Sequence, residues 1–154
     1  MIDPDVVELL GSACATFVGT VDADGAPAAA YGMGVLVSDD GSELRVVVSS
    51  EEARVLDNLR STGVVAIGAT DVFTLRSVQV KGRALRVEPV TAEDRIRTER
   101  YLAGYFDRVH QTDGTPLEKI RRMQPRDYAA FVMTVDELYD QTPGPQAGSV
   151  LSRS

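Results

Sequence analysis

The sequence predicts a mainly β protein with some α structure (β+α), built as a closed or split antiparallel barrel with helices packed outside it. Six stretches are rich in β-branched or alternating apolar residues, a pattern typical of strands. Turns rich in Asp and Gly, at residues 22–25 and 39–42, connect several of these stretches as hairpins. Because helical segments fall at the ends of runs of strands, the pattern disfavours a doubly wound parallel sheet.

One expected strand has an unusual composition. Gly32 and Gly34 flank Met33 within a run of small residues. Glycine inside a strand marks a bulge, or a place where a flat group lies against the backbone. The six expected strands are residues 14–21, 28–37, 44–48, 64–69, 75–87 and 128–139.

Two of these strands alternate strongly enough to predict an interface. In residues 75–87, Val78 and Val80 point to one face and Ser77 and Gln79 to the other. Together with residues 128–139 they present more apolar surface than one small barrel covers. We therefore expect a two-fold homodimer.

Helices are expected in four places. Asp3 caps a first short helix that has Pro4 in its first turn. Thr91 and Asp94 have capping-box spacing at the start of a long helix over residues 91–110, with an apolar stripe of Ile96, Leu102, Phe106 and Val109. The other two are a helix that follows residues 44–48 and ends at Gly63, and a short basic helix over residues 116–123.

Length and composition place the chain in a broad class. A chain of 154 residues with 44% apolar and 25% charged residues fits one globular domain, expected over residues 1–140. Residues 141–154 hold too much Pro, Gly and Ser for regular structure, which predicts an extended or flexible tail. A net charge of −7 argues against nucleic-acid and anionic-membrane partners. A single cysteine, an acidic start without a signal-peptide pattern and no spanning apolar run predict a cytoplasmic protein.

Several kinds of catalytic site are missing from the sequence. One cysteine and one histidine cannot supply a zinc site, and no dinucleotide, P-loop or serine-hydrolase motif is present. His110 falls at a helix C-terminus, where a surface position explains it better than a catalytic or haem-ligand role. Cys14 is expected to be a small buried residue.

The start of the second helix is a candidate anion site. Ser49 and Glu52 have capping-box spacing, Ser50 adds a hydroxyl, and Arg54 adds a cation one turn into the helix. Unpaired N–H groups and the helix dipole favour a phosphate there. Taken alone, this stretch is explained more simply as an ordinary capped helix.

The order of these motifs resembles the pyridoxamine 5′-phosphate oxidase-like family of flavin-binding split barrels. The residues concerned are TVDADGAP, a glycine-bearing strand, VVVSSEEARVLDNLRSTGVVAI and LRSVQVKGRALRV, over residues 16–90, with weaker support at 128–139. The resemblance implies a six-stranded antiparallel split β-barrel with flanking helices. It also implies a homodimer that binds FMN in a groove between protomers.

The resemblance assigns the cofactor site residue by residue. Ser49 and Arg54 match positions that contact the phosphate, residues 31–33 lie on the strand that lines the isoalloxazine, and Arg76 and Ser77 occupy the place of an Arg-Gln pair on the opposing strand. No catalytic residue is identified, and Tyr31, the nearest candidate for an acid or base, is explained better by packing. The expected cofactor-binding residues are Tyr31, Gly32, Met33, Val48, Ser49, Ser50, Arg54, Arg76, Ser77 and Gln79.

The chain also departs from the family pattern. Val55 stands where oxidase members have a lysine, Ala53 replaces a serine, and residues 28–30 lack a basic residue. The C-terminal Arg-Leu-x-Pro substrate signature is missing, so true pyridoxamine 5′-phosphate oxidase activity is not expected. The expected function is an FMN-dependent oxidoreductase that moves a hydride to or from a small organic substrate. The alternatives are a deazaflavin or haem cofactor, or a non-catalytic binding protein.

Overall fold

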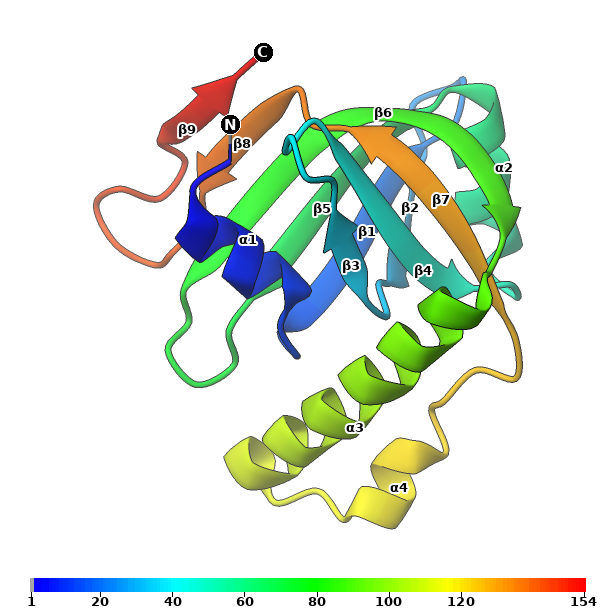
Figure 1. Ribbon diagram of the computed structural model, residues 1–154, viewed down its shortest axis with the longest axis vertical. Coiled ribbons are helices and arrows are strands. Elements are labelled where there is room, and N and C mark those ends of the chain that lie inside the picture. Colours follow the sequence, from blue (N-terminus) through cyan, green and yellow to red (C-terminus); the bar gives the residue numbers. More distant parts are fainter. Residues whose placement is uncertain (1) are drawn as a thin grey trace.

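The computed structural model of the protein describes residues 2–154 (Figure 1). A strongly curved antiparallel sheet forms the body, with α1, α3 and α4 outside it, and α2 packing against β1, β2 and β6. The helices are α1 (Pro4–Gly11), α2 (Ala53–Ser61), α3 (Ala92–Asp113) and α4 (Leu117–Arg121). The strands are β1 (Ala15–Val21), β2 (Pro27–Tyr31), β3 (Val35–Val37), β4 (Glu43–Ser49), β5 (Val64–Thr70), β6 (Ser77–Pro89), β7 (Tyr128–Thr134), β8 (Glu137–Asp140) and β9 (Val150–Arg153).

The strand order explains why the barrel is split. The main path is β2-β1-β5-β6-β7-β4-β3, with β8 pairing with β6 and β9. Its two end strands, β2 and β3, do not pair with each other but follow one another in the chain. The sheet therefore curls into a barrel that is not closed by hydrogen bonds between β2 and β3. This confirms the predicted fold class, although the described residues form nine strands and the prediction of six is wrong.

The expected strand 28–37 divides in two at residues 32–34. The N–H of Gly32 donates to Thr16 O at 2.9 Å, whereas the N–H of Met33 donates to Val47 O at 2.8 Å. The chain thus leaves β1 and joins β4 within two residues, in a segment (residues 32–34) that we call the crossover. Gly34 has φ 115°, which favours glycine, and a Cβ on Gly32 would lie 2.6 Å from Thr16 Cγ2.

The expected strand 128–139 also divides, at residues 135 and 136. Their N–H groups donate to Ser42 O and Lys81 O, in the connection between β7 and β8. Gly82 of β6 permits this close passage, because a Cβ there would lie 1.9 Å from Thr134 O. Close to Gly82, the pairing of β6 with β7 has a register shift between Ala84 and Arg86.

The helix predictions were partly right. Asp3 caps α1 with Pro4 in its first turn, the Thr91–Asp94 capping box of α3 is present, and Gly63 follows α2 with φ 67°. The predicted capping box of α2 is wrong: β4 runs through Ser49, the helix begins at Ala53, and the N-cap Glu52 makes no side-chain bond. Ile96 is 59% exposed and does not belong to the apolar stripe of α3.

Two apolar clusters hold the fold together. The larger fills the barrel under α1 and α2, and includes Leu10, Val18, Ile67 and Phe131. The smaller joins the crossover to α3 and α4. Its buried members are Met33, Tyr101, Leu102, Phe106 and Ile120. The smaller cluster places two helices directly against the crossover.

The C-terminal tail is more regular than predicted. Residues 150–153 form β9, which pairs with β8, so the prediction of no regular structure in the tail is wrong there. The Pro- and Gly-rich stretch before it forms the connecting turns, as its composition indicates. None of the helices in residues 2–154 has the length and apolar character needed to cross a membrane.

Candidate functional site

The crossover is fixed on both sides. Its backbone bonds to β1 and β4, described above, hold it in the sheet, and the hydroxyl of Thr98 on α3 donates to Met33 O at 2.8 Å. Thr98 is fully buried. The crossover therefore has a rigid backbone that joins the outer face of the sheet to α3.

The outer face of the sheet beside the crossover carries a row of opposed residues. Tyr31, Phe17, Gly68, Gln79 and Tyr139 lie directly opposite one another on β2, β1, β5, β6 and β8. Tyr31 and Phe17 are about half exposed, with ring centroids 5.2 Å apart. A Cβ on Gly68 would meet nothing within 4 Å, so the packing of this chain does not itself require glycine there.

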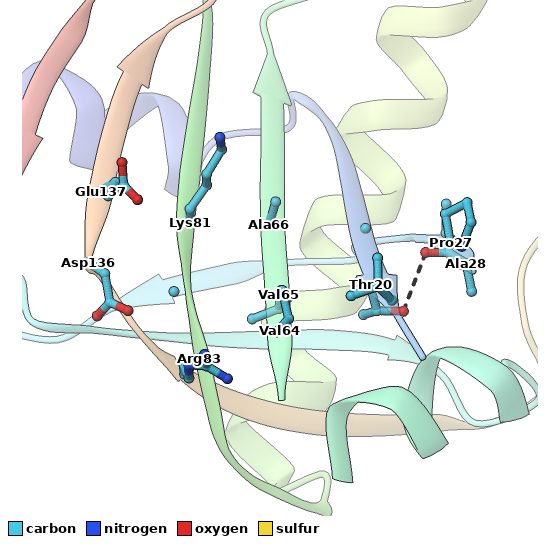
Figure 2. A pocket seen from close by; sticks show the side chains of 14 residues that line it. Thr20, Pro27, Ala28, Val64, Val65, Ala66, Lys81, Arg83, Asp136 and Glu137 are labelled. Carbon is cyan, nitrogen blue, oxygen red and sulfur yellow. Dashed lines mark hydrogen bonds between the residues drawn. The ribbon is translucent and has the colours of Figure 1, made fainter. Parts of the chain in front are cut away.

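A second row follows on the same face, made of Ala29, Gly19, Ala66, Lys81 and Glu137. Figure 2 shows this hollow, of about 710 Å³, with Lys81 and Arg83 on β6 and Glu137 at the start of β8. The centre of the face consists of small residues, and its rims carry aromatic and charged side chains. Such a surface fits a flat group or a second protein copy.

The start of α2 lies at the end of β4. Ser49 is buried and its hydroxyl accepts the N–H of Glu51 at 3.2 Å, while Ser50 is exposed. Arg54 extends from the first turn with 70% of its side chain exposed, and its nearest carboxylate is Asp22 at 4.0 Å. The Arg54 side chain is thus available to an anion. Glu51, Glu52 and Asp22 lie around the same helix start and partly offset its charge.

The structure brings together only part of the expected site. Met33 is hydrogen bonded to Val47, so the expected residues 31–33 lie beside the expected residues 48–50. Val48 is fully buried in the barrel core, and its side chain does not reach the surface. Within one chain, Val48 can therefore offer a ligand only its backbone.

The expected residues of β6 lie elsewhere. Arg76 and Ser77 line a different hollow, near the start of α1 and the tail. The Ser77 hydroxyl is held by Leu75 O and the Thr70 hydroxyl, both at 2.9 Å. Gln79 shares the outer-face row with Tyr31, three strands away. One chain therefore does not bring residues 76 and 77 to the crossover.

Sequence reasoning missed the aromatic wall that α3 contributes. Tyr101 and Tyr105 stack at 5.7 Å against a pocket of about 270 Å³ that also touches Tyr31 and Met33. The Tyr101 hydroxyl donates to Cys14 O at 2.7 Å, and burial raises the pKa of Tyr101 well above its usual value. The repeated tyrosines of the YLAGYF stretch were the available signal.

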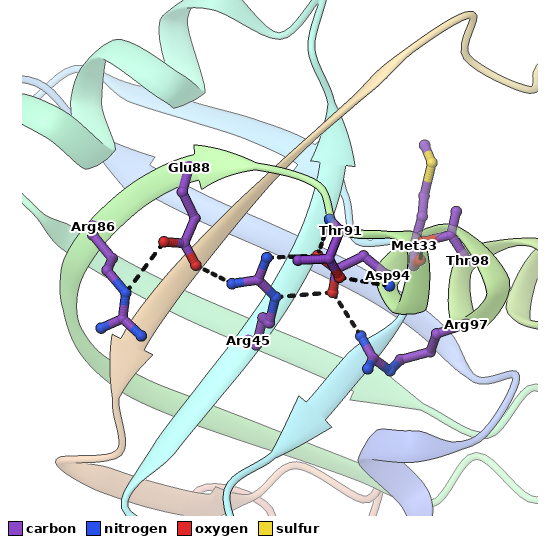
Figure 3. Close-up of polar contacts among 8 residues, drawn as sticks. All are labelled: Met33, Arg45, Arg86, Glu88, Thr91, Asp94, Arg97 and Thr98. Atoms are coloured by element: carbon purple, nitrogen blue, oxygen red, sulfur yellow. Dashed lines mark hydrogen bonds and ion pairs between the residues drawn. The ribbon is translucent and has the colours of Figure 1, made fainter.

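An ion-pair network was also not predicted from the sequence. Arg45 of β4 binds Asp94 of α3 and Glu88 of β6, and Arg97 joins the same Asp94 carboxylate at 2.9 Å (Figure 3). The Arg45 guanidinium holds the pKa of Asp94 well below its usual range. This network fixes the first turn of α3 to the barrel.

The remaining titratable residues do not form a metal centre. No group of three His, Cys, Asp or Glu side chains suited to a metal converges anywhere in residues 2–154. His110 lies exposed in the last turn of α3, with Nδ1 2.8 Å from Thr115 O, as its position predicted. Cys14 is fully buried, also as predicted.

Comparison with solved structures identifies the fold. HupZ of Group A Streptococcus superposes with a TM-score of 0.56 at 19% identity, over 96% of this chain and 100% of that one. An F420 reductase gives 0.57 at 18% identity, over 85% and 93%. A pyridoxamine 5′-phosphate oxidase-related, FMN-binding protein of Nostoc punctiforme gives 0.52 at 12% identity, over 94% and 87%.

Sequence comparison identifies the family. No curated protein matches the chain significantly. The family profile described as pyridoxamine 5′-phosphate oxidase, however, matches residues 2–142, which is nearly the whole chain. The chain therefore belongs to the pyridoxamine 5′-phosphate oxidase family.

Proposed function

We propose that this protein is an FMN-dependent oxidoreductase that works as a homodimer on a small organic substrate. The observation that carries the proposal is the outer face beside the crossover, where Gly68 lies open between Tyr31 and Gln79. A glycine that its own chain does not require indicates that something outside the chain packs closely there. Family membership makes a flavin and a second protomer the first candidates.

A two-fold dimer would reunite the separated site residues. In one chain, Arg76 and Ser77 lie away from the crossover. Packing the outer faces of two copies would cover Phe17 and Tyr31, whose aromatic rings are about half exposed. It would also allow Arg76, Ser77 and Gln79 of the second protomer to face the crossover of the first.

Each group of residues then has a distinct role. The Ser50 hydroxyl, the Arg54 guanidinium and the start of α2 would hold the phosphate. Within residues 2–154, the N–H groups of Arg54 and Val55 have no acceptor, so they remain available for a phosphate oxygen. The crossover backbone would line the flavin ring, which supplies hydride transfer when bound. Tyr31 would close one edge of the ring site.

The phosphate-binding side is weaker than the ring-binding side. Arg54 is accompanied by Glu51, Glu52 and Asp22, and Val55 occupies the position where a lysine would add a second cation. Like charges near a phosphate oppose its binding. This leaves room for a deazaflavin as the second candidate cofactor, and the similarity to an F420 reductase supports the same alternative. A haem cofactor and a non-catalytic binding role are the remaining alternatives.

The cofactor can be tested directly. We expect the purified protein to show flavin absorbance, or to acquire it during titration with FMN, and to oxidise NADH or NADPH in the presence of a dye. Light scattering should give a dimer at micromolar concentration. A colourless monomer that fails to bind FMN or a deazaflavin would exclude the proposal. Binding without turnover would support the non-catalytic alternative.

A further inference from the structure

We propose that the pocket between the crossover, α3 and α4 binds a compact aromatic cation, and that such a molecule is the substrate of the enzyme. Its role as the substrate site rests on the proposed function, because the pocket shares the crossover with the expected flavin site. Binding of the cation itself does not depend on a flavin. The pocket is named here the α3 pocket.

The α3 pocket is small and largely apolar. Its volume of about 270 Å³ lies just below the range usual for drug-sized ligands. Met33, Leu102, Phe106 and Ile120 line it and are themselves buried. Tyr105 adds an aromatic wall that is stacked on Tyr101, with the two rings inclined by only 17°. A flat aromatic ring fits these surroundings.

The polar groups of the α3 pocket include hydrogen-bond acceptors. Tyr31 and Tyr105 line the pocket, and neither hydroxyl bonds to any group in residues 2–154. Asp113 also lines the pocket, and its carboxylate accepts the N–H of Thr115 at 2.8 Å through Oδ1. That bond lowers the pKa of Asp113, so the carboxylate is ionised at neutral pH.

The electrostatics favour a positive ligand. Asp113 is the last residue of α3, a helix of 22 residues, whose C-terminal carbonyls add partial negative charge at the same point. An anion there would be repelled, and a neutral ligand would lack the charge that pairs with the carboxylate. A protonated amine satisfies Asp113, and the faces of Tyr31 and Tyr105 also attract a cation.

The first experiment compares three probes of similar size and different charge. Isothermal titration of the full-length protein would use phenethylamine, 2-phenylethanol and phenylacetate. We expect phenethylamine to bind about tenfold more tightly than 2-phenylethanol, since one charge-assisted bond distinguishes them, and phenylacetate to bind most weakly. Equal affinity for the three probes, or no binding of phenethylamine, would overturn the proposal.

The second experiment locates the interaction. Asp113→Asn keeps the oxygen that accepts the Thr115 N–H but removes the charge, so phenethylamine should bind about tenfold more weakly while 2-phenylethanol is unaffected. Asp107→Asn is the matched control, because Asp107 is an exposed carboxylate on the same helix and does not line the α3 pocket. Thermal melts would verify that both variants fold. If both variants lost phenethylamine affinity equally, the effect would not come from the α3 pocket.

A flavin titration separates this proposal from the proposed function. Binding of phenethylamine that depends on Asp113, in a protein that binds no flavin, would support the α3 pocket and count against the oxidoreductase. Flavin binding without phenethylamine binding would support the oxidoreductase and count against the α3 pocket as a cation site. Binding of the cation and the oxidoreductase function can therefore fail independently, whereas the role of the cation as substrate fails with the oxidoreductase.

Discussion

Asp94 of α3 and Arg45 of β4, 49 residues apart in sequence, form a hydrogen-bonded ion pair with Nε 2.8 Å from Oδ1. The same Asp94 carboxylate accepts the Thr91 N–H at 2.8 Å, which completes the capping box of α3 (Figure 3). One buried side chain thus starts the helix and attaches it to the barrel. Because α3 forms one wall of the α3 pocket, this attachment also positions the pocket.

Removing the Asp94 charge should destabilise the protein. Asp94→Asn would leave Arg45 and Arg97, both mostly buried, without the carboxylate that they share. Breaking a buried ion pair costs about 3–5 kcal/mol. We therefore expect the free energy of unfolding in urea to fall by about 3 kcal/mol or more.

The control for this prediction is Asp57→Asn. Asp57 pairs with Arg60 at 3.6 Å on α2, but its side chain is 77% exposed. An exposed pair contributes about 0–1 kcal/mol, so stability should hardly change. Similar losses for the two variants would show that the Asp94 network does not anchor α3.

The same network predicts a pH dependence. The pKa of Asp94 is held well below its ordinary value by Arg45, so its stabilising contribution is present above about pH 4 and is lost as the pH falls toward the folded-state value. Between pH 5 and pH 2.5, wild type should therefore lose more stability than Asp94→Asn. Urea unfolding of both proteins across this range measures the difference. If the difference in stability between the two proteins were constant across this pH range, the predicted pH dependence would not come from Asp94.

Local sequence signals were sufficient for some parts of the fold. The turn before β2 closes through Asp22, whose carboxylate accepts the N–H groups of Asp24 and Ala26, and this pattern is contained in adjacent residues. The capping box of α3 was equally local. Such features are predictable because the interacting groups are fixed a few residues apart.

Other parts depended on distant residues. The expected capping box at Ser49 fails because β4 continues to pair Ser49 with Tyr128, far along the chain. The crossover was predicted as continuous strand because its change of partner, from Thr16 to Val47, leaves no local mark except its glycines. The α3 pocket could not be predicted, since α3, α4 and the crossover meet only in the folded protein.

Two glycines on neighbouring strands should respond in opposite ways to substitution by alanine. Gly82→Ala would place a Cβ against the backbone of Thr134, so it should destabilise the fold by about 1–3 kcal/mol. Gly68→Ala meets open space and should leave unfolding unchanged or slightly improved. Denaturation midpoints compare the two variants.

The Gly68→Ala variant also tests the outer face. If a second protomer or a flavin lies against Gly68, the added methyl group should weaken dimerisation or FMN binding although the fold is intact. Sedimentation and flavin titration would measure both quantities. Unchanged dimerisation and unchanged FMN affinity would show that the open glycine has no partner.

Arg54 should determine how strongly the phosphate contributes to cofactor binding. Arg54→Ala removes a charge-assisted bond worth about 1.5–3 kcal/mol, so FMN should bind about tenfold to a hundredfold more weakly. Arg54→Lys should restore part of this affinity, because a point charge does not reproduce the guanidinium fork. Riboflavin has no phosphate and should bind wild type and Arg54→Ala equally. Flavin-fluorescence titrations measure all of these affinities.

Arg60→Ala is the matched control for the Arg54 prediction. Arg60 lies in the last turn of the same helix, with 57% of its side chain exposed, and Asp57 is the only carboxylate with which it pairs among the described residues. Its removal should leave FMN affinity unchanged, because the phosphate is expected at the opposite end of α2. Equal FMN affinity in wild type and Arg54→Ala would remove Arg54 from the site. An equal loss of FMN and riboflavin would instead show that the substitution damages the ring site or the fold, since only the phosphate distinguishes the two ligands.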